Sequence, residues 1–538
     1  MGVGTSRSNR TGLTGWFDLV DRAGMLDPRR IPSLTTAITR WGPTVAAPYA
    51  ATAFAKPHAI ALIDDHGSVT FSDLERRSTA SAKGLQSIGV RRGQRIGLAC
   101  LNHRDFVELT LAAAKAGLGV VYLNTSFAAP QMAEVVKRED ISVLAVDAAL
   151  LPVTDLVTSD VEIIVTDTDG THDDEHDPQR GRALADLRSA GTWRLPLRAS
   201  LPVAPVLLTS GTTGTPKGAQ RSNRVAPSSA TGVVELIPYR HDDVIAITSP
   251  LFHAWGLAQM VLASTIGATV SVMSTFDPVE TLARIERDQV TVLAVVPAIL
   301  QRLLASPALD DTDLSSLRVV ASSGSALPVP VVEEWLDRVG PNLYNLYGST
   351  EVGQATLATP SDLLAEPSTA GRVMPGSVVA ILDDDDREVP AGTVGRIFVG
   401  NGAQFEQYTG GGGKQVVDGL MSSGDVGRMT SDGLLFVTGR ADDMIVSGGE
   451  NVFPREVEDL VLTHPKIVDV AVVGVDDDEF GQRLAVYAVK APGARVSAAA
   501  IKNMVAANLA RHKTPRDVHF VGELPRTATG KIRRGLLT

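Results

Sequence analysis

The chain has 538 residues, 44% hydrophobic and 21% charged, which is the composition of a globular protein long enough for more than one core. Acidic residues outnumber basic residues by 61 to 50, and the net charge of −11 argues against a nucleic-acid partner. The single cysteine, Cys100, excludes a disulfide within the chain and a zinc site of several cysteines, and its apolar neighbours predict a buried strand residue. No stretch has the pattern of a secretory signal or a transmembrane helix, so we expect a cytoplasmic protein.

Short apolar runs alternate with amphipathic helical patterns over most of the chain. Residues 91–102 predict a strand, 103–117 a helix and 118–124 the next strand, a βαβ unit with parallel pairing. This alternation predicts a layered α/β architecture in which ligands bind at the carboxyl ends of the strands. It recurs at 244–248, 269–273, 290–305 and 317–324.

The pattern changes beyond about residue 370. Residues 376–400 predict two strands joined by an acidic connection, and 433–440 predict another strand, which together indicate a β-rich subdomain. From 442 onward, helices and strands follow one another as in a small α+β domain. We therefore predict a large domain at 1–441, with layered α/β sheets and a β-rich subdomain, and a small domain at 442–538.

Three polar segments resemble binding sites only superficially. His172 and His176 stand among carboxylates, but the turn residues around them favour a solvated loop over a metal-binding helix. Asp383–Asp386 lacks the spacing of a calcium loop and predicts a hairpin connection. The glycine run that ends at Lys414 follows no clear strand, so we interpret it as a surface turn rather than a phosphate-binding loop.

The loop at 209–218, TSGTTGTPKG, has little to pack and many groups that can bind an anion. Its glycines allow close backbone approach, successive N–H groups can form an anion-binding nest, and Lys217 adds a charge. The loop therefore predicts polyphosphate binding, although taken alone it could be an ordinary connection. It is not a Walker A loop, because Lys217 follows a proline and precedes a glycine.

With this loop and the motifs that follow it, the chain resembles the acyl-adenylate-forming, or AMP-binding, superfamily: acyl-CoA synthetases, adenylation domains and firefly-type luciferases. Thr209–Gly218 matches the T-S-G-T-T-G-x-P-K-G signature of that superfamily at every fixed position. The resemblance covers the chain from about residue 50 and implies a large N-terminal domain with a mobile C-terminal domain. The further motifs, in order, are PLFHAWGL at 250–257, SSGSALP at 322–328, LYGSTE at 346–351, SSGDVG at 422–427, GRADDMIVSGGENVFPREVE at 439–458 and PRTATGKIRR at 525–534.

The resemblance implies that ATP activates a carboxylic acid to acyl-AMP, with loss of pyrophosphate, and that coenzyme A then takes the acyl group. It implies Mg²⁺ as a cofactor, held by Glu351. The residues implied as catalytic are Lys531, Thr350, Glu351 and His253. Those implied to bind ATP or AMP are Thr209, Ser210, Gly211, Thr212, Thr213, Gly214, Lys217, Gly324, Ser325, Ala326, Tyr347, Gly348, Ser349, Thr350, Asp425, Arg440 and Lys531.

The same resemblance assigns individual roles. The 209–218 loop and Thr350 would contact phosphates, Tyr347 would stack on adenine, and Asp425 with Arg440 would bind the ribose. Lys531 would bridge the carboxylate and the ribose, and His253 would lie near the acyl pocket. In the second step the small domain would rotate about the hinge residue Asp442. The backbone of Ser447, Gly448 and Gly449 would then line the coenzyme A channel.

The acid and the acceptor are less sharply indicated. The N-terminal extension and the segment at 408–427 resemble bacterial fatty-acyl-CoA synthetases, so we expect a medium- or long-chain fatty acid. No segment resembles a carrier-protein domain, which favours coenzyme A as the acceptor. The alternatives are a fatty-acyl-AMP ligase that loads an acyl carrier protein and a catalytically silent member that only binds nucleotide or acyl ligand. Peripheral membrane contact and the oligomeric state stay open.

Two departures from the family pattern stand near the small domain. Where many members have a lysine after the hinge aspartates, this chain has IVSGG, and His512 stands where a tyrosine is common. The IVSGG variant also occurs in aryl- and medium-chain-like enzymes.

Overall fold

The computed structural model describes Gly24 and residues 30–166, 180–190, 204–208, 218–221, 227–402, 404–409, 411–447, 450–477, 481–527 and 530–537. The predicted phosphate loop at 209–217, the two histidines at 172 and 176, and Gly448 and Gly449 lie outside these residues. In the described part, the strands form three sheets. One lies in an N-terminal layer, one in a central layer and one in a C-terminal domain.

The N-terminal layer contains the predicted βαβ unit. Strand β3 (Arg95–Ala99) pairs in parallel with β4 (Gly119–Tyr122), and α5 (Arg104–Ala116) connects them, as expected. Cys100 follows β3 and is buried, also as expected. Gly117 ends the helix with φ 73°, in the left-handed conformation, which residues with a side chain rarely adopt. The sheet order is β19-β9-β8-β4-β3-β5-β6-β7.

The remaining elements of this layer have the following bounds: α2 (Arg30–Trp41), α3 (Ala46–Ala55), α4 (Phe71–Ser87), α6 (Ala129–Arg138), β5 (Ile141–Asp147), β6 (Glu162–Thr166), β7 (Arg182–Ala183), α7 (Leu184–Ser189), β8 (Val206–Leu208), β9 (Gly218–Arg221) and β19 (Phe405–Tyr408). Helix α4 lies against α5, and apolar residues from both helices and from β3 belong to one large buried core.

The central sheet joins the two predicted architectures. Its parallel half runs β14-β13-β12-β10-β11, and its antiparallel half continues from β14 through β15, β16, β22, β21 and β18 to β17. The acidic run at 383–386 connects β17 to β18 as a hairpin, as predicted. Bounds are β1 (Ile60–Asp64), β2 (Gly67–Thr70), β10 (Val244–Ile247), β11 (Thr269–Val272), β12 (Val292–Val295), β13 (Val319–Ser322), β14 (Leu343–Ser349), β15 (Gly353–Ala358), β16 (Gly371–Val373), β17 (Ser377–Leu382), β18 (Gly395–Asn401), β20 (Val416–Val417), β21 (Leu420–Met429) and β22 (Leu434–Arg440).

Helices cover this sheet, and a small domain follows it. The helices are α8 (Pro227–Leu236), α9 (Ala254–Ile266), α10 (Pro278–Arg287), α11 (Pro297–Leu304), α12 (Val329–Arg338) and α13 (Pro360–Ala365). The C-terminal domain has its own sheet and apolar core. Its elements are β23 (Ile445–Ser447), β24 (Glu450–Val452), α14 (Pro454–Leu462), β25 (Ile467–Asp477), β26 (Gly481–Lys490), α15 (Ala498–Asn508) and β27 (Asp517–Val521).

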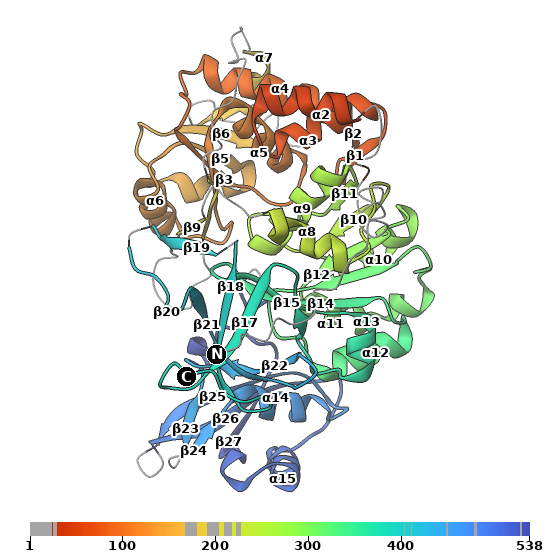
Figure 1. The fold of residues 1–538 in the computed structure, drawn as a ribbon, viewed down its shortest axis with the longest axis vertical. Helices are drawn as coiled ribbons and strands as arrows, with labels where there is room; N and C mark the ends of the chain where they lie inside the picture. Colours follow the sequence, from red (N-terminus) through yellow and green to blue (C-terminus); the bar gives the residue numbers. More distant parts are fainter. Residues whose placement is uncertain are drawn as a thin grey trace, which may run out of the picture.

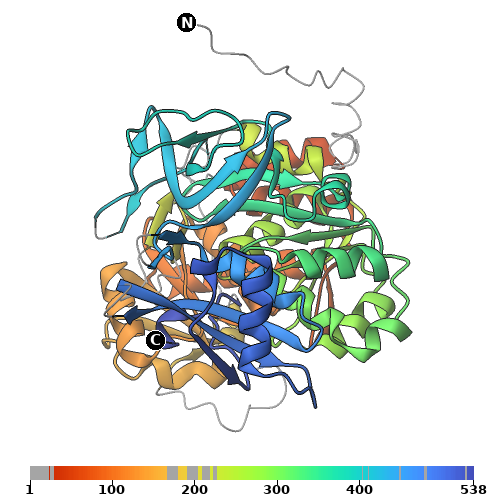
Figure 2. The ribbon, with the colours of Figure 1, turned by 90° about the horizontal axis from the view of Figure 1, so that it is seen from below.

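The fold class is therefore the predicted one: a large α/β domain with a β-rich part and a small α+β domain. Figure 1 shows the N-terminal layer at one end of the long axis and the C-terminal domain at the other. Figure 2 shows, from below, that the small domain covers parts of the large one. The boundary between 441 and 442 and the mobility of the small domain stay predictions. None of the helices in the described residues is long and apolar enough to cross a membrane.

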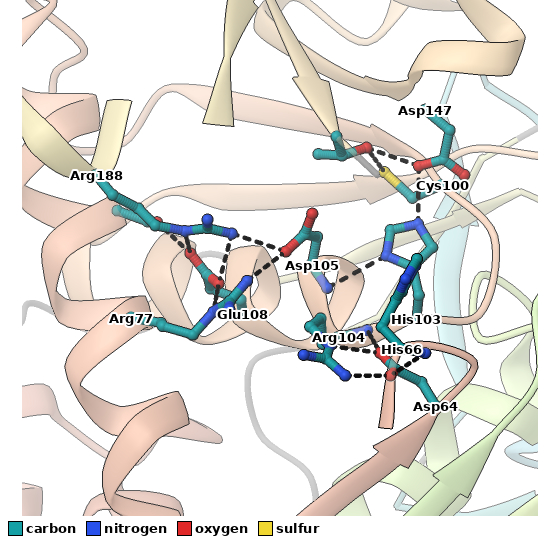
Figure 3. Close-up of polar contacts among 12 residues, drawn as sticks. Asp64, His66, Arg77, Cys100, His103, Arg104, Asp105, Glu108, Asp147 and Arg188 are labelled. Atoms are coloured by element: carbon teal, nitrogen blue, oxygen red, sulfur yellow. Dashed lines mark hydrogen bonds and ion pairs between the residues drawn. The ribbon is translucent and has the colours of Figure 1, made fainter. Parts of the chain in front are cut away.

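A buried polar network fixes the junction between β3 and α5 (Figure 3). We call it the β3–α5 network, and its members include Arg77, His103, Glu108, Asp147 and Arg188. Glu108 is fully buried and accepts hydrogen bonds from Arg77 and Arg188, each at 2.8 Å. His103 Nε2 lies 2.9 Å from Asp147 Oδ1, and His103 Nδ1 accepts a hydrogen bond from the backbone N–H of Asp105 at the start of α5. Because each buried charge has a partner, the network avoids the large cost of an unpaired ion in the core.

Candidate active site

Asp425 and Arg440 lie opposite one another on the neighbouring strands β21 and β22. Arg440 Nη1 is 3.6 Å from Asp425 Oδ1, and the hydroxyl of Tyr347 donates to Asp425 Oδ2 at 2.6 Å. Tyr347 belongs to β14, on the other half of the central sheet. The fold therefore brings three of the predicted nucleotide-binding side chains together, although 78 residues separate the tyrosine from the aspartate.

The charges and burial around Tyr347, Asp425 and Arg440 favour Asp425 as a hydrogen-bond acceptor for hydroxyl groups. Burial raises the pKa of Asp425, while the hydrogen bond from Tyr347 and the charges of Arg440 and Lys414 oppose that rise. Burial and the neighbouring carboxylate raise the pKa of Tyr347 far above its usual value, so the phenol stays protonated and donates. One oxygen of the Asp425 carboxylate accepts the hydrogen bond from Tyr347. The carboxylate has further lone pairs that can accept hydrogen bonds from other hydroxyl groups.

Glu351 is held in the turn between β14 and β15. The hydroxyl oxygen of Ser349 accepts from the backbone N–H groups of Glu351 and Val352, each at 3.2 Å. The Glu351 carbonyl accepts from the backbone of Phe405 at 2.8 Å, and its carboxylate accepts from the hydroxyl of Tyr408 at 3.1 Å. Thr350 is half-buried in the same turn.

The donor set at Glu351 fits a magnesium ion that arrives with phosphates. Mg²⁺ keeps several waters and is usually bound through one or two carboxylates together with substrate phosphate oxygens. Glu351 supplies one positioned carboxylate, and the described residues contain no group of three or more acidic, histidine or cysteine side chains that could hold a metal without a substrate. A metal carried on a nucleotide is consistent with this arrangement.

Lys531 reaches the same place from the C-terminal domain. Lys531 is exposed, and partial desolvation together with the cations Arg440 and Lys414 lowers the pKa of its ammonium group, against the opposing effect of Glu351 and Asp425. The charges of Glu351 and Asp425 therefore both act on this lysine. We call these five side chains, Glu351, Asp425, Arg440, Lys414 and Lys531, the charged cluster.

A glycine lets the Lys531 loop approach the large domain closely. Gly530 has φ +76°, and a Cβ placed on it would lie 2.9 Å from the Cβ of Ala298, at the start of α11. Gln301 of the same helix also donates to the Val468 carbonyl of the small domain at 3.1 Å. The structure thus has the small domain in the orientation that places Lys531 in the charged cluster, which the sequence could not predict.

His253 lies where α9 begins, and burial is the main reason why its pKa falls to about 3, with the charge of Lys531 adding to the effect. Its Nε2 is buried and, among the residues described, has no hydrogen-bond partner. Asn102 fixes the loop before it: its side chain donates to the Ser249 carbonyl at 3.1 Å and accepts from the Leu251 N–H at 2.8 Å. The site therefore presents a neutral imidazole.

The predicted adenine-side loop follows β13, next to β14. Gly324, Ser325 and Ala326 are exposed, and Gly324 has φ +96°. The preceding Ser323 donates to the Leu346 carbonyl at 2.9 Å, which ties the loop to the strand that carries Tyr347, Gly348 and Ser349.

The residues that flank the predicted phosphate loop are connected to Glu351 through neighbouring strands. Its residues Thr209, Ser210, Gly211, Thr212, Thr213, Gly214 and Lys217 lie outside the described part of the chain. The flanking residues Leu208 and Gly218 pair with each other across β8 and β9. Strand β9 pairs with β19, which carries Tyr408, the donor to Glu351.

The residues predicted to form the hinge and the coenzyme A channel are only partly described. Asp442 follows Arg440 and accepts two hydrogen bonds from it. Ser447 ends β23 and pairs with Gly481 at the edge of the small sheet, whereas Gly448 and Gly449 lie outside the described residues.

The sequence interpretation missed Lys414. Gly411–Gly413 are exposed, as the surface-turn interpretation expects, and Lys414 is half-buried, with its ammonium group donating to the Ser423 carbonyl at 2.7 Å. An Asp-Gly turn links β20 to β21, with positive φ at both Asp418 and Gly419, the pattern of a type I′ hairpin. That dipeptide was the available signal, because the register it sets brings Lys414 level with Ser423.

Two protein-family models match the sequence of this chain. A model of the AMP-binding enzyme family matches residues 49–409, and a model of the AMP-binding enzyme C-terminal domain matches 456–531.

The chain belongs to the AMP-binding enzyme family.

This AMP-binding enzyme has relatives with different acids in their names. An indoleacetate–CoA ligase of Aromatoleum aromaticum is 32% identical over 467 residues, which cover 84% of this chain and 89% of the relative. A long-chain-fatty-acid–CoA ligase of Mycobacterium tuberculosis is 28% identical over 476 residues, covering 87% and 92%. The crystal structure of the anthranilate CoA ligase AuaEII with anthranoyl-AMP superposes with a TM-score of 0.83 at 24% identity, over 92% of this chain and 96% of that one. The chain is a member of the AMP-forming acyl- and aryl-CoA ligase superfamily.

Proposed function

We propose that this protein is an acyl-CoA synthetase that uses ATP to join a medium- or long-chain fatty acid to coenzyme A. The observation that carries the proposal is the charged cluster, in which side chains from both domains meet. The fatty-acid preference rests on the resemblance of the N-terminal extension and of residues 408–427 to fatty-acyl-CoA synthetases. An aromatic acid is the second candidate, because the indoleacetate ligase is among the relatives.

The first step joins the acid to AMP. A carboxylate oxygen attacks the α-phosphorus of ATP, the bond to the bridging oxygen breaks, and pyrophosphate leaves with the electron pair. Such a step needs positioning and charge neutralisation more than covalent help from the protein. In our proposal, Asp425 accepts from the ribose hydroxyls, Arg440 and Tyr347 orient Asp425, and Lys531 draws the carboxylate toward the phosphorus.

The other proposed groups serve the same step. Mg²⁺ held by Glu351 and the phosphates would neutralise negative charge on the leaving pyrophosphate. Thr350 and the 209–218 loop would contact those phosphates. His253 stays uncharged because of its low pKa. It therefore offers the acid a hydrogen bond without competing with Lys531 as a second cation.

The second step transfers the acyl group. Rotation of the small domain about Asp442 would remove Lys531 from the cluster and bring Ser447–Gly449 to the pantetheine path. The thiol sulfur then attacks the acyl carbonyl, the proton of the thiol leaves to solvent, and AMP departs with the bonding electrons. We keep the cytoplasm as the proposed location.

A mass-spectrometric assay tests the proposal. The purified protein is incubated with ATP, Mg²⁺ and a series of fatty and aromatic acids, with and without coenzyme A. The proposal expects acyl-CoA and AMP, with the highest yield from medium- or long-chain fatty acids. A higher yield from aromatic acids would overturn the fatty-acid preference. Acyl-AMP that accumulates regardless of coenzyme A would indicate a carrier-protein-loading ligase, and no product with any acid would indicate a silent member.

A further inference from the structure

Lys414 lies within the charged cluster, although it belongs to none of the motifs of the sequence analysis. It follows the exposed glycines and precedes β20, and its Nζ donates to the Ser423 carbonyl at 2.7 Å. Arg440 Nη1 is 3.5 Å from the same carbonyl oxygen. Two cationic side chains therefore meet on one neutral acceptor, two residues before Asp425.

Both cations cover the same side of β21. A Cβ placed on Gly424 would come within 3.1 Å of Arg440 Nη2 and 3.2 Å of Lys414 Nζ. Gly424 has φ +83°, so this position favours glycine for its conformation as well as its lack of a side chain. The backbone at 423–424 thus forms a platform on which an arginine and a lysine flank the carboxylate that follows.

Among the described residues, Lys414 has no direct ion pair. Within the part of the chain that the structure describes, its one hydrogen bond is to the Ser423 carbonyl. The nearby carboxylates are engaged elsewhere, Asp425 with Tyr347 and Asp442 with Arg440. Lys414 still acts on its surroundings: its positive charge opposes the rise that burial causes in the pKa of Asp425, and it contributes to the lowered pKa values of Asp442 and Lys531.

An ammonium group in this position has N–H donors left for a ligand. A ribose hydroxyl can donate to a carboxylate and at the same time accept from a cation. Asp425 supplies the acceptor, and Lys414, half-buried beside it, supplies the donor. The alternative is a purely structural lysine that clamps the β20–β21 hairpin through the Ser423 carbonyl.

We propose that Lys414 is a nucleotide-binding residue that donates a hydrogen bond to a ribose hydroxyl of ATP, next to Asp425. The proposal rests on the assignment of Asp425 to the ribose in the proposed function. It adds a second cation to the ribose contact, supplied by the loop between β19 and β21 rather than by a motif strand.

Titration calorimetry with ATP, 2′-deoxy-ATP and 3′-deoxy-ATP tests the proposal on the full chain. The variants are Lys414→Met, which removes the charge at similar length, and Lys414→Arg, which keeps a cationic donor. Gln415→Ala is the control, because this exposed neighbour contacts Arg396 and Asp386 rather than the cluster. Binding needs no acyl substrate, so an incorrect acid or acceptor assignment does not affect this experiment.

We expect Lys414→Met to weaken ATP binding roughly tenfold, the scale of one hydrogen bond to a charged group. Lys414→Arg should retain most of the affinity, and Gln415→Ala should match the wild type. With the deoxy-nucleotide that lacks the contacted hydroxyl, Lys414→Met and the wild type should bind equally. A clamp alone would give the same loss with all three nucleotides. That result, or an unchanged ATP affinity in Lys414→Met, would overturn the proposal.

Discussion

Arg440 connects the charged cluster to Asp442, the proposed hinge residue. Its Nε and Nη2 donate to the two carboxylate oxygens of Asp442 at 2.9 and 3.0 Å, while its Nη1 lies 3.6 Å from Asp425 Oδ1. The hydrogen bonds and charge of Arg440 lower the pKa of Asp442, although desolvation alone would raise it. In the proposed function, a rotation about Asp442 would rearrange a partner of Asp425, and this would link the position of the small domain to the bound nucleotide.

The hinge assignment predicts a selective defect in Asp442→Pro. Proline fixes φ, so the variant should lose thioester formation from supplied acyl-AMP while pyrophosphate release stays largely intact. Asp442→Ala is the control, because it removes the carboxylate and leaves the backbone free. Separate assays of the two half-reactions measure the effect. Similar losses in Asp442→Pro and Asp442→Ala would show that the side chain matters and the hinge does not.

The low pKa of His253 predicts a pH dependence of stability. In the folded protein the pKa of His253 is about 3, so the imidazole stays neutral at higher pH. In the unfolded chain its pKa is near 6.5. Between these values the unfolded state binds more protons, so the free energy of unfolding should fall as the pH falls from about 6.5.

Replacing the imidazole tests this assignment. Denaturant unfolding at about pH 5 and pH 7 should show a smaller difference in His253→Gln than in the wild type. Equal pH dependence in the two proteins would mean that His253 titrates normally in the folded state.

Two consecutive arginines of α4 should contribute very unequally to stability. Arg77 pairs with Glu108, whose side chain is fully buried, whereas Arg76 pairs with Asp73 and its side chain is 75% exposed. Leaving a buried charge without any partner costs about 3–5 kcal/mol, and an exposed pair contributes about 0–1 kcal/mol. Because Arg188 still pairs with Glu108 in Arg77→Met, we expect a cost between these two ranges. Arg77→Met should therefore lower the thermal unfolding midpoint by several degrees, and Arg76→Met should barely change it. Equal shifts would contradict the role given to the β3–α5 network.

Much of the fold follows from local patterns in the sequence. The helix at 104–116 has an apolar face, a capping His103 and a terminal Gly117, and the flanking strands are short apolar runs. The acidic hairpin at 383–386 also follows from its turn residues. These features are local, so the alternation of apolar and polar residues is enough to predict them.

The site was predictable as a set of residues but not as an arrangement. The family resemblance named Asp425, Glu351 and Lys531, yet the meeting of Lys531 with the other two depends on the orientation of the small domain. Lys414 was missed because its position depends on the hairpin register and on the backbone at 423–424, which no apolar pattern records. The low pKa of His253 likewise results from burial among residues distant in the sequence.

In the proposed function, the protein adenylates a carboxylic acid while Lys531 lies in the charged cluster. The most direct test compares both half-reactions in Lys531→Ala with those of the wild type, using the best acid from the mass-spectrometric assay. We expect acid-dependent pyrophosphate release to fall by a factor on the order of 10²–10³, the usual cost of losing one preorganised donor. Thioester formation from supplied acyl-AMP should stay close to the wild-type rate. An equal loss in both half-reactions, or no loss in pyrophosphate release, would contradict the account.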